Sequence, residues 1–153
     1  MHADPITAFY TAFTRGDGEA MAACYSGEIA FDDPAFGRLT GQDAGDMWRM
    51  LCGASGSPTV TFQVVQSRSG STTVRWTADY AFGARRRPVH NEVVAHLVVR
   101  DGLIVEHHDV FDFPRWARQA LGLPGLLLGW SPLVQRKVRA GARARLAAFQ
   151  ARA

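Results

Sequence analysis

The sequence predicts an α+β fold: a cone-shaped barrel in which N-terminal helices pack on a curved antiparallel sheet, followed by a C-terminal helical extension. Three segments between residues 5 and 52 are typical of helices, and in the first of them apolar residues recur with a helical period. Over residues 59–112 the period changes to two, and Val, Thr, Phe and Trp dominate. Turn residues divide this second stretch into four runs, and such short joints require antiparallel neighbours. With 47% hydrophobic residues among 153, the chain can bury one compact core.

Three helices are expected before the sheet. Pro5 suits the first turn of a helix, and Gly16 ends it. Asp17 can cap a second helix that reaches Cys24 or Tyr25. The segments that follow are expected to be a short strand at 28–33, a loop at 34–41 and a third helix at 40–52.

Four long strands and a helical tail complete the expected order. Ser69-Gly70 and Asp101-Gly102 are typical of tight turns between antiparallel strands. The strands are expected at 59–68, 71–83, 88–100 and 102–112. The tail is expected to form a short helix at 113–121, an apolar loop at 122–130 and a basic helix at 132–151. Residues 1–112 would thus form the barrel, and residues 113–153 a basic helical extension of the same domain.

The charge is unevenly distributed along the chain. Residues 113–153 carry eight of the 17 basic residues and none of the 14 acidic ones, so the body is acidic and the tail basic. We expect the tail to cover its own body, with Leu126, Leu127, Leu128 and Trp130 buried. A second interpretation, which we do not favour, places this apolar stretch on an anionic membrane surface. Nucleic-acid binding is not expected, because the arginines are not interleaved with stacking aromatic residues.

Several classes of protein are not expected. The chain has no apolar run of 18 residues and no basic, apolar leader at its N-terminus, so we expect a cytoplasmic protein without a membrane span. Cys24 and Cys52 lack the spacing of a metal site and are interpreted as small buried thiols. His107 and His108 are adjacent on a strand and point to opposite faces, so no metal site is expected. No cofactor is expected either, because glycine-rich phosphate loops are missing.

Two acidic positions carry the functional prediction. Asp33 precedes Pro34 at the end of one strand-like run, and Asp109 lies near the end of another. Aromatic neighbours would strip water from both carboxylates, which raises the pKa of such groups and favours proton transfer. Strand alternation places His107 on the face of Asp109, where the two side chains can share a proton. Alternatives remain open: a turn-capping role for Asp33 and an edge salt bridge for Asp109.

The remaining candidates would shape a cavity for a small apolar molecule. Trp76 and Tyr80 share one face of the second long strand, and Asn91 shares a face with the inward Val93 on the third. The expected ligand-contacting residues are Phe9, Tyr10, Tyr25, Phe31, Trp48, Trp76, Tyr80, His90, Asn91 and Phe111.

This order of elements, with the segments 9–17, 24–34 and 101–112, resembles the nuclear transport factor 2-like superfamily over roughly residues 5–115. Within it, the chain is similar to ketosteroid isomerases, SnoaL-like polyketide cyclases and limonene epoxide hydrolases. The resemblance implies the barrel fold. It aligns Asp33 with the general base of the isomerases, and Asp109 with the water-activating aspartate of the epoxide hydrolases.

The partner residues of those enzymes are replaced here. The oxyanion-hole donors of the isomerases align near Phe9 and Ala95, which cannot donate a side-chain hydrogen bond. The arginine and aspartate of the epoxide hydrolases align near Trp76 and Ala78. The sequence therefore predicts acid/base proton transfer or water activation on an apolar substrate in a homodimer. The alternative is a non-catalytic ligand-binding or dimerisation module with the same fold.

Overall fold

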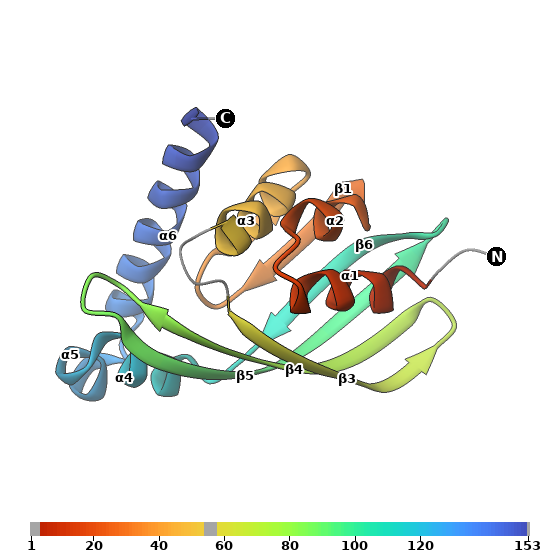
Figure 1. Cartoon of the computed structure of the whole chain (residues 1–153). Coiled ribbons are helices and arrows are strands. Elements are labelled where there is room, and N and C mark those ends of the chain that lie inside the picture. Colours follow the sequence, from red (N-terminus) through yellow and green to blue (C-terminus); the bar gives the residue numbers. More distant parts are fainter. Residues whose placement is uncertain (1–3, 54–57, 153) are drawn as a thin grey trace.

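A computed structural model describes residues 4–53 and 58–152 (Figure 1). The N-terminal half contains α1 (Pro5–Thr14), α2 (Gly18–Ala23), β1 (Tyr25–Asp33), β2 (Gly37–Thr40), α3 (Gln42–Gly53) and β3 (Thr59–Arg68). The C-terminal half contains β4 (Ser71–Phe82), β5 (Arg87–Arg100), β6 (Leu103–Val110), α4 (Phe113–Leu121), α5 (Leu123–Leu128) and α6 (Pro132–Arg152). The α+β class and the N-terminal helices are confirmed. None of the helices described is long and apolar enough to cross a membrane.

The six strands form one curved sheet in the order β2-β1-β6-β5-β4-β3. The four strands from β3 to β6 pair antiparallel, as predicted. The sheet as a whole is mixed rather than purely antiparallel, because β1 lies parallel to β6. More than 60 residues separate these two strands in the chain, so no tight turn restricts their direction. The sheet is also not closed, and β2 and β3 are its edges.

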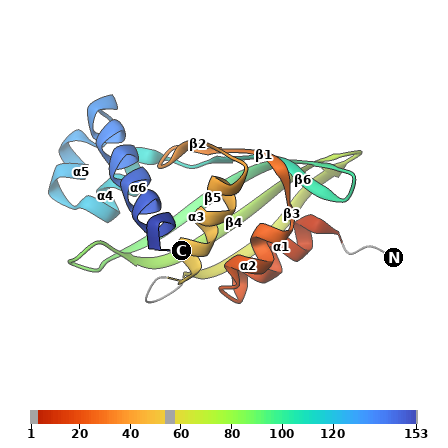
Figure 2. The ribbon, with the colours of Figure 1, turned by 90° about the horizontal axis from the view of Figure 1, so that it is seen from above.

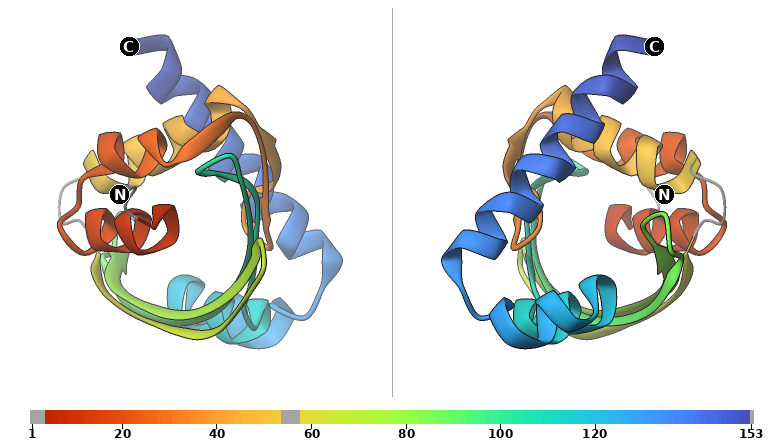
Figure 3. Two further views of the ribbon diagram at one scale, coloured as in Figure 1. Left: turned by 90° about the vertical axis from the view of Figure 1, so that its right-hand side faces the viewer. Right: turned by 90° about the vertical axis from the view of Figure 1, so that its left-hand side faces the viewer.

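The N-terminal helices cover the concave face of the sheet (Figures 2 and 3). Asp4 caps α1 by accepting hydrogen bonds from the backbone N–H groups of Ile6 and Thr7. Asp17 caps α2 through the N–H of Ala20, as expected. These caps fix where each helix begins, so the apolar side of α1 meets the inner face of the sheet.

Two segments differ from the expected elements near the sheet. Part of the loop expected at 34–41 is strand β2, which pairs antiparallel with the end of β1. The two residues of the Asp101-Gly102 turn both have a positive φ, at 54° and 78°, which a two-residue hairpin with right-handed strand twist requires. This turn pairs Arg100 with Leu103, and a bulge farther along shifts the register so that Asp109 lies opposite Ala95.

The tail packs on the body through α6. Ala142 and Leu146 are buried against the core, and Val134 and Val138 pack against a second apolar cluster around α4. Arg143 donates hydrogen bonds to the backbone carbonyls of Phe36 and Arg38. At the far end of α6, Gln150 bonds two aspartates of α3. The expectation that a basic helix covers its own body therefore holds for α6.

The segment between α4 and α6 contradicts two expectations. Residues 122–130 contain a short helix, α5, where an apolar loop was predicted. Leu126, Leu127, Leu128 and Trp130 were expected to be buried, but each is 50% or more exposed. The physical reason is that α5 contacts α4 through glycine rather than leucine: Gly125 is buried directly on the backbone of Ala117.

Candidate functional site

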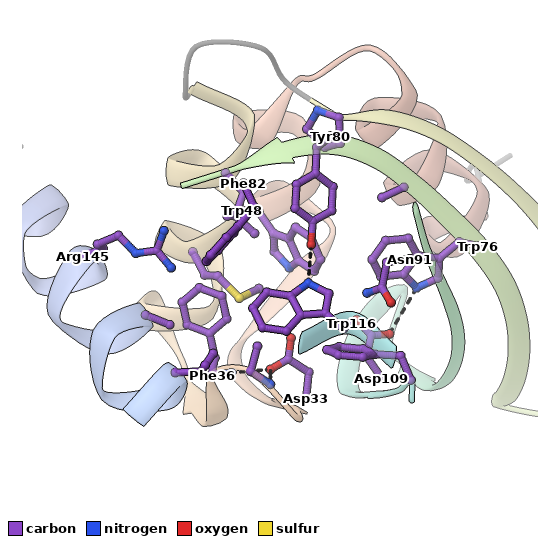
Figure 4. A pocket seen from close by; sticks show the side chains of 18 of the residues that line it. Asp33, Phe36, Trp48, Trp76, Tyr80, Phe82, Asn91, Asp109, Trp116 and Arg145 are labelled. Carbon is purple, nitrogen blue, oxygen red and sulfur yellow. Dashed lines mark hydrogen bonds between the residues drawn. The ribbon is translucent and has the colours of Figure 1, made fainter. Parts of the chain in front are cut away.

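An apolar cavity of about 230 Å³ lies between the concave sheet face, α3 and the tail (Figure 4). Its polar lining groups are Asp33, Asp109, Asn91, Tyr80 and Arg145. The apolar wall includes Phe13, Phe36, Met47, Trp48, Leu51, Trp76, Phe82, Phe111, Trp116, Val138 and Ala142. The volume is below the roughly 300–1,000 Å³ typical of sites for drug-sized ligands. The cavity therefore suits a small molecule that is mainly apolar.

Asp33 reaches the cavity from the end of β1. Its Oδ1 accepts hydrogen bonds from the backbone N–H groups of Ala35, at 3.0 Å, and Phe36, at 2.6 Å. The turn-capping role is thus real and coexists with the position on the cavity. Burial raises the pKa of Asp33 to about 7. The two backbone hydrogen bonds lower this pKa, and the charge of Asp109 makes a smaller contribution that raises it. Asp33 can therefore hold a proton near neutral pH.

Asp109 reaches the cavity from β6 and is only 2% exposed. Its Oδ1 accepts a hydrogen bond from Trp76 Nε1 at 3.3 Å and lies 2.9 Å from His107 Nε2. Among the described residues, its second oxygen has no hydrogen-bond partner, and no lysine or arginine pairs with this carboxylate. The two acids that line the cavity thus differ in their support: backbone amides hold Asp33, and two side chains hold Asp109.

A chain of hydrogen bonds lies behind Asp109. Trp48 Nε1 donates to the Tyr25 hydroxyl at 2.8 Å, and that hydroxyl lies 2.7 Å from His107 Nδ1. Indole nitrogen can only donate, so the Tyr25 oxygen accepts from Trp48 and its own hydrogen is free for His107. His107 then carries its hydrogen on Nε2 and donates it to Asp109. Every polar hydrogen in the chain has an acceptor in this arrangement.

Three further polar groups face the cavity. The Tyr80 hydroxyl accepts a hydrogen bond from Trp116 Nε1 at 2.7 Å, which leaves its own hydrogen without an acceptor among the described residues. Burial raises the pKa of Tyr80, so the phenol keeps that hydrogen at neutral pH. The Asn91 side chain is buried and makes no hydrogen bond within the described part of the chain. Arg145 of α6 lies over the ring of Phe82 at 5.5 Å.

The structure divides the residues proposed from the sequence into two groups. Asp33, Asp109, Trp48, Trp76, Tyr80, Asn91 and Phe111 line the cavity. The residues that do not line it are Phe9, Tyr10, Tyr25, Phe31, His90 and His107.

The first four of these exceptions, with His107, form the core beneath the cavity. Phe9 stacks on Tyr25 at 5.2 Å and meets the edge of His107 at 5.4 Å. Phe31 meets the same imidazole at 5.2 Å. His90 was wrongly expected at the cavity: its side chain is on the outer sheet face, exposed and bonded to Asp79.

Sequence reasoning missed the wall that the tail supplies. Trp116, Val138 and Ala142 face the cavity, and Arg145 is the cation of its lining. The apolar stripe of α6 was recognisable from its spacing, but the element it would meet was not. Among the described residues, no group of three or more His, Cys, Asp or Glu side chains is placed to hold a metal ion.

The chain belongs to the SnoaL-like domain family, whose sequence pattern matches residues 6–107. The match ends before Asp109 and the tail. No curated protein matches the chain.

Solved structures show the same fold at low sequence identity. A hypothetical protein with a ketosteroid isomerase-like fold from Catenulispora acidiphila, in complex with trimethylamine, has a TM-score of 0.67 and 19% identity, over 82% of this chain and 97% of that one. A proposed polyketide cyclase from Silicibacter has a TM-score of 0.64 and 18% identity, covering 76% and 93%. An epoxide hydrolase from M. tuberculosis, similar to limonene epoxide hydrolases, has a TM-score of 0.60 and 20% identity, covering 85% and 92%. The chain is thus related in fold to cyclases, isomerases and epoxide hydrolases.

Proposed function

We propose that this protein catalyses proton transfer on a small, largely apolar molecule bound in the cavity, with Asp109 as the proton acceptor. One observation carries the proposal: two carboxylates open onto one apolar cavity, and no lysine or arginine among the described residues neutralises either. A purely structural pair of buried acids would be matched by cations, because an unpaired buried charge is costly. The non-catalytic alternative explains this arrangement less well.

The two acids suit complementary roles. Asp109 lines the cavity, and its second oxygen, which has no hydrogen-bond partner among the described residues, can accept a proton from a carbon next to a carbonyl, or from a bound water. Asp33, whose pKa is about 7, can be protonated at the same pH and donate to the oxygen where negative charge develops. A proton returned from Asp109 to another carbon would complete an isomerisation. In a ring closure, the carbon that lost its proton would instead attack a carbonyl carbon of the same molecule, and the alkoxide oxygen formed there would take up a proton.

His107 acts through Asp109 in this scheme. It is buried behind the carboxylate and does not line the cavity, so it is a positioning residue. Its hydrogen on Nε2 holds Oδ1, which leaves the second oxygen of the carboxylate free to act on a ligand. Tyr80 and Asn91 supply the free hydrogen-bonding groups that orient a ligand's oxygen, and the aromatic wall excludes water.

Deuterium exchange tests the proposal without knowledge of the natural substrate. Cyclohexanone, α-tetralone and dimedone would be incubated with the protein in deuterium oxide, and exchange at the α-carbon followed by NMR. Styrene oxide would serve as the probe for water activation. We expect catalysed exchange or epoxide opening that depends on Asp109. If all four probes bind in the cavity, as seen by NMR shifts of Trp76 or Trp116, but none reacts, the protein is a binding module.

The predicted homodimer, formed through the outer sheet face, and the cytoplasmic location both stay predictions. The outer face carries Asp79, His90, Glu92 and His108, so a dimer there would rely on polar contacts. Sedimentation of the full chain over a range of concentrations would decide the oligomeric state.

A further inference from the structure

A cluster of large apolar side chains is exposed at the junction of α5 and α6. We call it the leucine patch; it consists of Leu123, Leu126, Leu127, Leu128, Trp130 and Leu133. Each is between 50% and 73% exposed. The other exposed large hydrophobic residues in the described part of the chain are four scattered positions on strands, all below 50%. Six exposed large apolar side chains within eleven residues of the chain indicate an interaction site.

The packing of α5 turns the leucine patch outward. A Cβ on Gly125 would lie 2.0 Å from the carbonyl oxygen of Ala117, so α5 touches α4 through bare backbone. Gly129 is buried beside it. The leucines of α5 lie around the rest of the helix and are exposed. Trp130 Nε1 donates a hydrogen bond to the carbonyl of Leu127 at 3.0 Å. Because the polar atom of the indole already has a partner, the ring can enter apolar surroundings without leaving that atom unsatisfied.

The charge around the leucine patch is positive and mostly unpaired. The tail has eight basic residues and no acid. Among the described residues, only Arg115 of these eight pairs with a carboxylate, that of Glu92. Arg143 contacts backbone carbonyls instead. Arg136 and Lys137, three and four positions after Leu133 on α6, are exposed.

We propose that the leucine patch docks on an anionic phospholipid bilayer. Leucine and tryptophan side chains would enter the boundary between head groups and acyl chains, while Arg136 and Lys137 meet lipid phosphates. A second copy is a poorer occupant, because a two-fold contact would bring the two basic tails together. The proposal does not depend on the chemistry in the cavity. Figure 1 shows α5 beside α4, and Trp116 of α4 lines the cavity, so docking would bring the bilayer close to the helix that walls the cavity.

Co-sedimentation of the full chain with vesicles tests this docking. One set of vesicles contains only phosphatidylcholine, and the other contains equal parts of phosphatidylcholine and phosphatidylglycerol. We expect at least about tenfold tighter binding to the anionic set, weakened by salt. A Leu126→Gln/Leu127→Gln/Trp130→Gln variant should lose at least about tenfold. The matched control Val64→Thr/Val65→Thr, which changes exposed apolar residues on β3, should bind like the wild type.

Two further measurements keep the result decisive. Trp130 is 73% exposed and the other three tryptophans are buried, so vesicles should shift the emission to shorter wavelength through Trp130 alone. An Arg136→Gln/Lys137→Gln variant should weaken anionic binding by about fivefold per cation. Failure of the wild type to bind either vesicle set overturns the proposal, as does wild-type binding by the triple variant. Concentration-dependent dimers that the triple variant abolishes, without vesicle binding, would assign the patch to a second copy.

Discussion

Asp33 and Asp109 illustrate how neighbouring atoms give two identical side chains different chemistry. Two backbone N–H groups and burial act on Asp33 in opposite directions, and burial has the larger effect on its pKa. Asp109 instead receives side-chain donors from Trp76 and His107. An acid that can hold its proton at neutral pH and an acid held by two donors form the unlike pair that acid/base catalysis requires.

Replacing Asp109 by asparagine should abolish most of the activity. The amide cannot accept a proton, and loss of a general base typically costs about a hundredfold or more in rate. The measurement is α-proton exchange on a reactive ketone probe, with circular dichroism to verify the fold. Val65→Thr on the edge strand β3 is the control and should retain full activity. Unchanged exchange in the asparagine variant would assign the base to Asp33.

The free energy of unfolding should depend on pH through the titration of Asp33. Its pKa is near 3.8 in an unfolded chain and about 7 in the folded protein, so between these pH values the folded state binds more protons. The free energy of unfolding therefore falls as pH rises through this window. The Asp33→Asn variant lacks this titrating group. Its free energy of unfolding should therefore increase relative to that of the wild type, by roughly 1 kcal/mol or more, as the pH rises through the window. Urea titrations at several pH values provide the test, and a constant difference would show that the pKa is not raised.

Two buried tyrosines offer a matched test of the hydrogen-bond chain. Tyr25→Phe leaves Trp48 Nε1 and His107 Nδ1 without their partner, which should cost about 1–3 kcal/mol and lower activity by loosening Asp109. The Tyr10 hydroxyl is buried and has no hydrogen-bond partner among the described residues. Tyr10→Phe should therefore be neutral or stabilising. Equal losses in the two variants would mean that the chain contributes nothing beyond packing.

At the scale of the elements, strand alternation was the most reliable guide. It places His107 and Asp109 inside and Glu106, His108 and Val110 outside, and the burial of β6 follows that pattern. The turn at Asp101-Gly102 was also predictable from the sequence, since few other residue pairs accept its backbone angles. These features are local, so the sequence contains all the information that they need.

Features that depend on distant partners were not predictable. The pairing of β1 with β6 joins segments far apart in the chain, and the apolar period of α6 does not reveal that it covers α3 and the cavity. The leucines at 126–128 indicate burial by composition alone. The contact of Gly125 with Ala117 shows that α5 packs on the protein through its glycine and not through its leucines.

The attachment of α5 can be tested with one methyl group. Gly125→Ala would place a Cβ 2.0 Å from a backbone oxygen that cannot move aside, so α5 should separate from α4 and become sensitive to limited proteolysis. The control is Gly141→Ala in α6, where an added Cβ meets nothing within 4 Å. That substitution should stabilise the helix by roughly 0.5–1 kcal/mol. Equal protease resistance in both variants would contradict the close contact.

At the scale of the whole molecule, the acidic body and basic tail are joined with little charge pairing. Apolar contacts and bonds from Arg143 and Gln150 hold α6, and Arg115 makes the one ion pair between tail and body in the described residues. Added salt should therefore leave the melting temperature almost unchanged, while it weakens binding to anionic vesicles. Calorimetry and co-sedimentation over one salt series give both results. A melting temperature that drops steeply with salt would show that charge holds the tail in place.

The cavity wall is built partly from the sheet and partly from α6, so substitutions in α6 can change the wall without moving the acids on the sheet. Asp33 and Asp109 lie on strands of the sheet, whereas Val138, Ala142 and Arg145 lie on α6. Of these five residues, only Asp33 falls within the region 6–107 that matches the family. Variation in that helix can reshape what the cavity accepts without moving either acid. A library restricted to these three positions should therefore yield variants with new ligand preferences that keep the same proton acceptor. A terminal helix can thus diversify what the cavity recognises while the sheet keeps both acids in place.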